Sequence, residues 1–341
     1  MRFSPIFTDH AVLPAHKTIR VYGDGDGQLA VSLAGITTKT ISKSGRWSVD
    51  FPPMDYGGPY ELKLETPDET IVLSDIYVGE VYLFSGQSNM QFKLSQSNTP
   101  KSEYEDLDML RYFSAQRPEK GDYFTPENGW VISRADEVAH WSSIAYITSR
   151  AISKQKRIAV GAIFCAQGAS VIESWVPCGA FDQRGISIPL EMKYPDHICE
   201  RYSSWNKDGM LYESMLSQIF PYSLTGVVWY QGESDTSLEE GAIYADELRA
   251  LIEIWRQAFC DNDLPFIIVQ IADLINAAPG RNGWKIIQSA QEEVGATMHG
   301  VTTVISHDIC ENDMIHPISK FALSNRIAEA LMRFNTDIHI Q

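Results

Sequence analysis

A serine in the segment Gly86-Gln87-Ser88-Asn89-Met90 has the surroundings of a catalytic nucleophile. It follows the apolar run 81–84, which predicts a buried strand, and a glycine lies two residues before it. A serine in this position can enter a cleft while its backbone N–H stays free to bind an oxyanion. The segment is not the Gly-x-Ser-x-Gly elbow of α/β-hydrolases, because position 90 is Met. Taken alone, it fits equally well a turn in which Ser88 only caps a helix.

The segment from Asp308 to Pro317 contains the residues for a general base. Asp313 and His316 have the Asp-x-x-His spacing, in which a carboxylate can reach the imidazole Nδ1 and direct Nε2 toward a nucleophile. The same segment also holds Asp308 and Glu311, and carboxylates with an imidazole can bind zinc. The other histidines show no ligand spacing, however, so we expect neither a metal nor a cofactor.

Polar or small residues follow two more predicted strands. Gln231 comes directly after the apolar run 226–230, and its amide could donate to developing negative charge, although hydrogen bonding within the loop explains it as well. Gly168 follows the run 161–164, where a small residue allows a backbone N–H to approach a ligand, or simply helps a helix to start. Each feature is ambiguous alone. Together they supply the parts that a serine hydrolase requires, at the ends of different strands.

The order of the predicted elements brings those strand ends together. From residue 76 onward, apolar strands alternate with helical segments, which predicts an α/β fold with a parallel sheet covered on both faces. Ligands of such sheets bind at the carboxyl ends of the strands. The predicted strands are 80–85, 158–164, 226–230, 265–271 and 301–306, and the predicted helices are 143–155, 239–259, 284–294 and 318–334. We expect residues 97–141 to form an irregular excursion.

Residues 1–77 show a different pattern, with short alternating strands separated by turns rich in Gly, Asp and Pro. This pattern predicts a small antiparallel β-sandwich domain, and residues 78–341 then form the catalytic domain. The glycine-rich segment 23–27 leads into a strand, so we predict a hairpin turn there instead of a phosphate-binding loop.

Composition limits the partners of the chain. Its 341 residues carry a formal net charge of −16, which argues against binding to nucleic acid or anionic membranes. The five cysteines are odd in number and widely spaced, which is typical of reduced thiols. No signal-peptide-like segment begins the sequence and no stretch is long enough to span a membrane, so we expect a cytoplasmic location. Nothing in the sequence indicates the oligomeric state.

Three segments in order resemble a known family. Residues 79–90, 229–234 and 315–320 look like the signatures of SGNH-superfamily carbohydrate esterases of the sialate O-acetylesterase and acetylxylan-esterase-like type. Residues 45–47 and 57–62 are similar to the jelly-roll-like β-domain that precedes the hydrolase in these enzymes. The resemblance implies a flavodoxin-like three-layer α/β/α domain that removes acetyl groups from sugar hydroxyls through an acetyl-serine, without a cofactor.

The resemblance also assigns roles to residues. It makes Ser88 the nucleophile and His316 the base, and it places the Ser88 N–H, the Gly168 N–H and the Gln231 amide around the oxyanion. The family's usual Gly-Gly-Thr block is Gly-Ala-Ser at 168–170 here. Asp313 is the expected acid; Asp308 is the alternative, and a Ser-His dyad is the third possibility.

The remaining expectations concern the substrate. Gln87, Asn89, Glu233 and Trp175 are the candidates for substrate binding, although a single Trp more often fills a core. The expected partner is an acetylated sialic acid or xylo-oligosaccharide, with a neutral oligosaccharide favoured. The alternatives are an inactive carbohydrate-binding relative, a lipase or short-chain thioesterase on the same fold, and a metal hydrolase.

Overall fold

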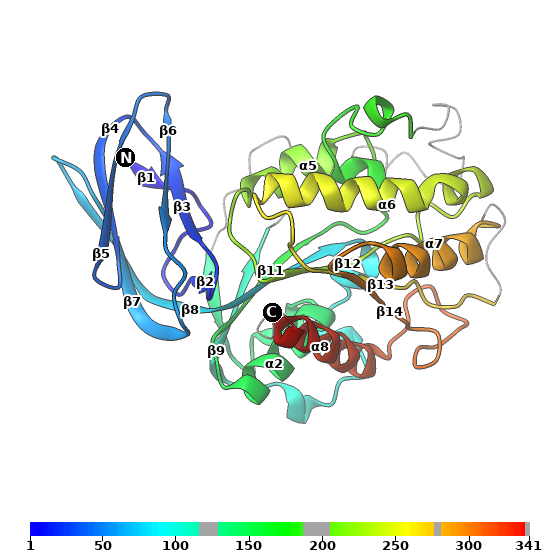
Figure 1. The fold of residues 1–341 in the computed structure, drawn as a ribbon. Helices are drawn as coiled ribbons and strands as arrows, with labels where there is room; N and C mark the ends of the chain where they lie inside the picture. Colours follow the sequence, from blue (N-terminus) through cyan, green and yellow to red (C-terminus); the bar gives the residue numbers. More distant parts are fainter. Residues whose placement is uncertain (116–128, 187–204, 276–280, 338–341) are drawn as a thin grey trace.

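The computed structural model describes the chain apart from residues 116–128, 187–204, 276–280 and 338–341 (Figure 1). Its N-terminal part is built mainly from antiparallel strands, and the remainder is a sheet with helices on both faces. The strands of the N-terminal part are β1 (Arg2–Phe3), β2 (Val12–Pro14), β3 (Ile19–Asp24), β4 (Gly27–Leu33), β5 (Ile36–Ser42), β6 (Arg46–Phe51), β7 (Gly57–Glu65) and the first half of β8 (Thr70–Gly86).

The N-terminal strands form two sheets that share one core. Strands β1, β3 and β6 make one sheet, while β4 pairs with β5 and β7, and β7 pairs with β8. Buried and exposed residues alternate along β3 and β6, as expected for strands with one face toward a core. The antiparallel sandwich predicted from the sequence is therefore present.

The glycine-rich segment 23–27 is not a hairpin turn, contrary to our prediction. It connects β3 to β4, but β3 pairs with β1 and β6, whereas β4 pairs with β5 and β7. The segment thus carries the chain from one sheet to the other. Its glycines at positive φ, Gly25 and Gly27, allow the change of direction that this crossing needs.

Strand β8 joins the two parts of the molecule. Its first half pairs with β7 and β2, and its second half pairs in parallel with β11 and β12 in the central sheet. The predicted domain boundary after residue 77 falls inside this strand. One continuous strand therefore connects the β-sandwich to the element that ends at the candidate nucleophile.

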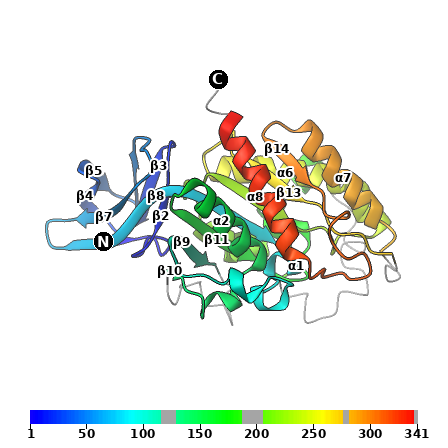
Figure 2. The same cartoon turned by 90° about the horizontal axis from the view of Figure 1, so that it is seen from below.

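The central sheet has the order β10-β9-β11-β8-β12-β13-β14, and its strands are parallel apart from the edge strand β10. Helices α2 and α8 cover one face and helices α6 and α7 cover the other (Figures 1 and 2). The flavodoxin-like three-layer α/β/α arrangement is confirmed. The bounds are β9 (Leu107–Ser114), β10 (Trp130–Ser133), β11 (Val160–Ala166), β12 (Gly226–Tyr230), β13 (Phe266–Val269), β14 (Val301–Val304), α2 (Ser143–Lys156), α6 (Leu238–Ala258), α7 (Trp284–Thr297) and α8 (Lys320–Asp337).

Shorter helical turns lie in the connections. They are α1 (Ser88–Gln91), α5 (Met210–Ser214) and the 3₁₀ turns Leu94–Gln96, Lys101–Glu103, Val138–His140, Ile172–Trp175, Asp182–Arg184 and Leu216–Gln218. In the described part of the chain, no helix combines the length and the apolar character needed to cross a bilayer.

The prediction of an irregular excursion over 97–141 was wrong, because β9 and β10 lie within it. Strand β9 pairs in parallel with β11 and extends the sheet. Arg111 interrupts its apolar pattern in the sequence but is buried, because its guanidinium donates to Asp75 at 2.8 Å and lies over the Tyr77 ring. A partner from another strand thus makes a charged residue compatible with a buried strand.

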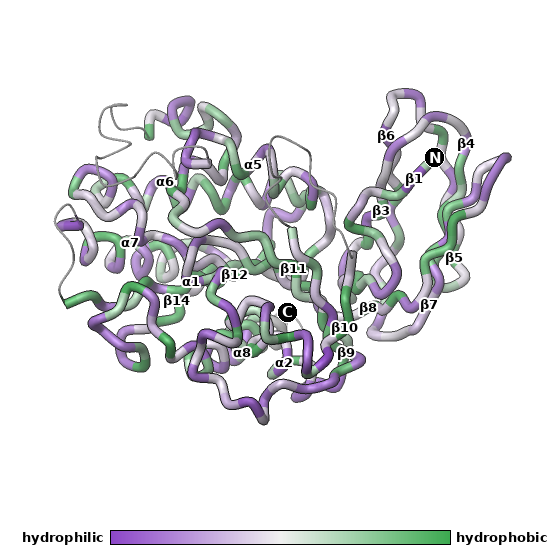
Figure 3. The backbone as a smooth tube through the Cα atoms, turned by 180° about the vertical axis from the view of Figure 1, so that it is seen from behind, coloured by the Kyte–Doolittle hydropathy of each residue, from purple (hydrophilic) through white to green (hydrophobic). Residues whose placement is uncertain are grey.

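Hydrophobic packing holds the layers together. Trp229 in β12 packs edge-on against Trp175 and Trp255 on the α6 side of the sheet. The neighbouring Tyr230 belongs to the core on the other side, with Leu323 and Ile327 of α8. Hydrophobic stretches recur in the strands of both parts, while the outer connections are mostly hydrophilic (Figure 3). The alternation of side chains along β12 therefore decides which layer each residue faces.

The end of β8 lies against β12 so closely that residue 86 must be glycine. Gly86 has φ of 136°, and an added Cβ would lie 2.1 Å from the Tyr230 carbonyl oxygen. Gly35, in the β4–β5 turn, also has a positive φ of 82°, but its Cβ would meet nothing within 4 Å. Both glycines thus need a positive φ, but only Gly86 has no room for a Cβ atom.

We expect Gly86→Ala to lower the free energy of unfolding much more than Gly35→Ala. Gly35→Ala should cost about 1–2 kcal/mol, the strain of a left-handed residue. Gly86→Ala adds a backbone overlap, so β12 must shift and Ser88 with it. Urea denaturation of both variants measures the difference. Equal losses in the two variants would show that the close approach to Tyr230 is unimportant.

Candidate active site

Ser88 lies just after the carboxyl end of β8, where the strand order of the sheet changes direction. The chain leaves β8 toward β9 and β11 on one side and later places β12 on the other side. In flavodoxin-like sheets this switch point is where ligands bind. Ser88 is the first residue of α1, so its backbone N–H has no carbonyl partner within the helix. A partly exposed hydroxyl and an available N–H therefore meet at one point.

His316 reaches Ser88 from the loop that follows β14. Its Nε2 lies 2.7 Å from Ser88 Oγ, and its ring packs at a tilt against Phe92, with 6.4 Å between the ring centroids. Burial lowers the pKa of His316, and the positive charges of Lys320 and Arg281 lower it further. A pKa below the usual range keeps the imidazole neutral near pH 7, so it can accept the Ser88 proton. The predicted nucleophile and base are thus in contact.

The structure brings neither predicted acid to His316. Asp308 forms a two-point ion pair with Arg326, at 2.6 and 2.9 Å, which turns its carboxylate toward α8. Asp313 is exposed and makes no hydrogen bond or ion pair with His316. Among the described residues, no carboxylate contacts His316 Nδ1. The Asp-x-x-His spacing fails here because the loop projects Asp313 into solvent. The geometry fits the Ser-His dyad.

Gln231 does not point toward Ser88, contrary to our expectation. Its amide nitrogen donates to the Ser170 carbonyl at 2.9 Å and to Asp235, and its oxygen accepts from Tyr244 of α6. Both amide hydrogens are therefore in use inside the protein. The reason is the alternation along β12: Gln231 continues the Trp229 side, toward α6, and so turns away from Ser88.

Gly168 lies beside Ser88, as the resemblance implied. A Cβ built on Gly168 would be 3.6 Å from the Ser88 Cβ, so the two backbones are close. The Gly168 N–H donates to the exposed side chain of Gln91 at 3.0 Å. An oxyanion can use this donor only when the Gln91 side chain moves aside. The small-residue block thus supplies a backbone N–H at the expected place, and the Gln91 side chain accepts from it in this structure.

The four expected substrate-binding residues are buried. The exposed fractions are 3% for Gln87, 0% for Asn89, 1% for Glu233 and 0% for Trp175. The Gln87 side chain accepts from two backbone N–H groups after β12, and the Trp175 indole donates to Ser170. These side chains support the site from inside the protein and are not available to contact a sugar. The expectation was wrong because a polar or aromatic residue near a strand end can turn into the protein, as all four do.

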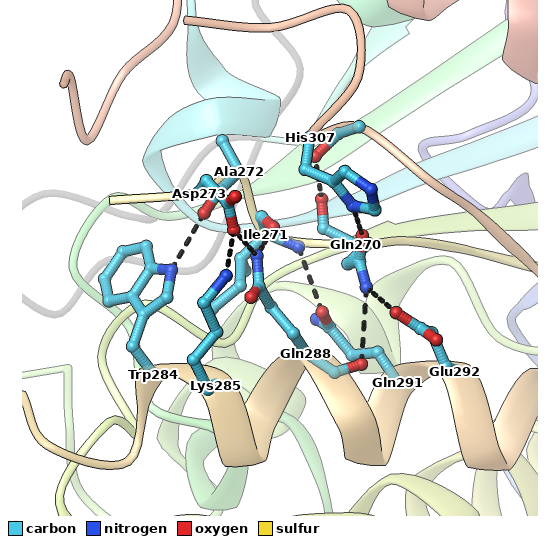
Figure 4. Close-up of polar contacts among 11 residues, drawn as sticks. Gln270, Ile271, Ala272, Asp273, Trp284, Lys285, Gln288, Gln291, Glu292 and His307 are labelled. Atoms are coloured by element: carbon cyan, nitrogen blue, oxygen red, sulfur yellow. Dashed lines mark hydrogen bonds and ion pairs between the residues drawn. The ribbon is translucent and has the colours of Figure 1, made fainter. Parts of the chain in front are cut away.

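A second histidine at a strand end, His307, belongs to a separate polar network (Figure 4). Its Nδ1 lies 3.1 Å from the Gln270 amide oxygen, and Gln270 also donates to Glu292 of α7. Gln291 of the same helix accepts from the Ile271 N–H and donates to the Gln231 carbonyl. This network fixes the segments after β12 and β13. Over the described residues, no three His, Cys, Asp or Glu side chains are grouped as metal ligands.

The sequence interpretation missed Lys320, the first residue of α8. It is fully buried, and its ammonium donates to the Asn89 side chain at 2.6 Å. It belongs to the segment 315–320, but nothing in the spacing singled it out. Its place at the start of the last helix was the available signal, since a cation is unfavourable at a helix N-terminus.

We expect Asp313→Asn and Asp308→Asn to keep most of the activity. Loss of an orienting aspartate in a serine triad lowers kcat by about 10⁴-fold. Because neither carboxylate contacts His316, each variant should lose less than about tenfold in turnover of 4-nitrophenyl acetate. Ser88→Ala is the control that fixes the level of complete loss. A loss near that of Ser88→Ala in one aspartate variant would identify it as the acid.

Comparisons with known proteins find similarity to carbohydrate esterases. The family described as "Carbohydrate esterase, sialic acid-specific acetylesterase" matches residues 196–333. Sialate O-acetylesterases of Pongo abelii and Homo sapiens are each 25% identical over 324 aligned positions, covering 85% of this chain and 60% of theirs. The sialate O-acetylesterase of Mus musculus is 26% identical and covers 96% of this chain and 72% of its own. The chain thus spans about 60% of the length of the first two relatives.

A solved structure shares the fold. A carbohydrate acetylesterase from Xanthomonas citri superposes with a TM-score of 0.83 and 23% identity, over 96% of this chain and 74% of its own. The shared fold includes the N-terminal strands as well as the three-layer sheet, since nearly the whole chain is covered. The chain is thus similar in sequence to sialate O-acetylesterases, and it shares its fold with a carbohydrate acetylesterase.

Proposed function

We propose that this protein is a serine carbohydrate O-acetylesterase that works with a Ser88–His316 dyad. The observation that carries the proposal is the 2.7 Å contact between His316 Nε2 and Ser88 Oγ, at the switch point of the sheet. The relatives named above are carbohydrate acetylesterases, and that is the chemistry this contact supports.

In the proposed reaction, Ser88 Oγ attacks the acetyl carbonyl carbon while His316 Nε2 takes the hydroxyl proton. The carbonyl oxygen becomes an oxyanion and binds the Ser88 and Gly168 N–H groups, with the Gln91 side chain displaced. The bond to the sugar oxygen then breaks, and His316 protonates that oxygen. Water, deprotonated by the same histidine, releases acetate and restores Ser88.

The proposed substrate is a sugar with an acetylated hydroxyl. The names of the relatives favour acetylated sialic acid over xylo-oligosaccharide, whereas the net charge of −16 disfavours an anionic sugar. Arg281 is half-buried near His316, and its positive charge would locally offset the negative net charge of the protein. Acetylated sialic acid is therefore the first substrate to test. A cytoplasmic location remains a prediction from the sequence.

An inactive carbohydrate-binding relative is the rival from another class. A binding module has no need of a serine whose proton can pass to a neutral imidazole. Covalent labelling by a fluorophosphonate separates the two, because it requires an activated serine. A lipase or thioesterase would instead prefer long-chain esters or thioesters over acetylated sugars.

We expect wild-type protein to release acetate from O-acetylated sialic acid and to label at Ser88 with a fluorophosphonate. Ser88→Ala should lose both reactions, and His316→Ala should lose turnover by several orders of magnitude, because the dyad acts as a unit. Acetate release and intact-protein mass spectrometry are the measurements. Acetylated xylo-oligosaccharides and a series of longer acyl esters serve as comparison substrates. Wild-type turnover in folded Ser88→Ala would rule out the nucleophile.

A further inference from the structure

The side chain of Asn89 connects the nucleophile to the base through buried hydrogen bonds. Its Nδ2 donates to the Ile315 carbonyl at 2.9 Å and to the Glu233 carboxylate, while its Oδ1 accepts from Lys320 at 2.6 Å. Asn89 directly follows Ser88, and Ile315 directly precedes His316. One amide therefore ties the start of α1 to the loop that carries the histidine.

Lys320 fixes which way this amide faces. An ammonium only donates, so it must face the amide oxygen, and the carbonyl and carboxylate on the other side accept only from the amide nitrogen. If the Asn89 amide were flipped, its oxygen and nitrogen would exchange places and these hydrogen bonds could not form. The Lys320 ammonium is also 5.2 Å from the ring centroids of both Phe92 and Tyr230. Because Asn89 is in α1 and Lys320 begins α8, their hydrogen bond joins α1 to the first turn of α8, and the two helices lie side by side (Figure 2).

The buried position of Lys320 is unfavourable for the stability of the folded protein. The residue is 0% exposed and begins α8, where the helix dipole disfavours a cation. Its ammonium donates to a neutral amide, and the Glu233 carboxylate bonds the other end of that amide. A buried charge held in this way stabilises the fold less than an apolar residue of the same size would. Its presence therefore points to a role in the site.

We propose that Lys320 is a positioning residue for the proposed reaction: acting through Asn89, it holds His316 against Ser88 and replaces the orienting carboxylate of a triad. The inference rests on the proposed function for its effect on turnover. It explains how a histidine with no carboxylate at Nδ1 keeps its 2.7 Å contact with the nucleophile. The backbone at Ile315 and the Phe92 ring hold the imidazole from two sides.

The charge of Lys320 has a second effect on His316. Burial, Lys320 and Arg281 all lower the His316 pKa, so the base stays neutral to lower pH. Burial also lowers the pKa of Lys320 to about 8, while Cys310, Glu233 and Glu311 act in the opposite direction, so the ammonium is mostly charged at pH 7. Removing this charge raises the His316 pKa. The acid limb of the kcat/KM profile must then move to higher pH.

Two variants separate the hydrogen bond from the charge. Lys320→Met removes both, so kcat/KM for 4-nitrophenyl acetate should fall by about 100-fold, the effect of a misplaced catalytic group. Lys320→Gln keeps a donor for Asn89 and loses the charge, so it should lose less than about tenfold. Both should shift the acid limb to higher pH. Asn89→Ala combined with Lys320→Met should lose no more than the worse single variant, because both act in one chain of contacts.

The matched control is Lys156→Met. Lys156 likewise donates to a buried side chain, the carboxylate of Glu80, but at the point where β8 enters the central sheet, away from Ser88. It should leave both kcat/KM and the acid limb unchanged. Circular dichroism and thermal unfolding confirm that each variant is folded.

A folded Lys320→Met or Lys320→Gln variant with wild-type kcat/KM and an unmoved acid limb would overturn the proposal. NMR titration of the His316 ring protons, assigned with His316→Gln, tests the same point without any substrate. If wild-type protein released no acetate, the proposed function would fail, yet the titration in Lys320→Gln would still decide the inference. An unshifted His316 titration there would reject the link to Lys320.

Discussion

The contact between Ser88 and His316 joins residues 228 positions apart, and the rest of the site depends on it. A hydrogen bond of this length tolerates little error, so both ends must be held by rigid elements. Ser88 is held by β8, which lies in the centre of the sheet between β11 and β12. His316 has no such strand under it and lies in a loop. Its position must come from contacts with other parts of the fold.

Glycine and amide side chains at the sheet edge provide those contacts. Gly86 allows the end of β8 to lie directly against Tyr230, and the Gln87 N–H donates to the same carbonyl. The Gln87 side chain then accepts from the loop after β12, while Asn89 bonds the loop after β14. Successive residues around Ser88 therefore fix different neighbours. The residues that the sequence suggested for substrate binding serve to hold the site in shape.

Electrostatics in this site differ from those of a serine triad. In a triad, a carboxylate beside the histidine stabilises the imidazolium that forms during the reaction. Here the described charges near His316 are the cations Lys320 and Arg281, which favour the neutral imidazole. A histidine in this environment stays neutral to lower pH, and in the proposed reaction its imidazolium gives the proton readily to the leaving sugar oxygen. The same cations would stabilise the negative charge of the proposed oxyanion.

The sequence by itself determined the layered α/β fold, five of the strands of its central sheet, and the pairing of Ser88 with His316. Strand β12 has the predicted bounds, because five consecutive apolar residues between turns leave little choice. These features follow from local patterns and short motifs. The sequence could not show that Arg111 lies in a buried strand, since Asp75 comes from another part of the chain.

Only the tertiary structure decided how the polar residues around the nucleophile are used. Gln231 and Glu233 are two positions apart, yet the first bonds Tyr244 of α6 and the second bonds Asn89 beside Ser88. Asp313 has the spacing of a catalytic acid but lies in solvent. Lys320, which no spacing rule selects, lies buried against Asn89. The physical reason is that side-chain direction depends on strand register and loop path, and long-range packing sets both.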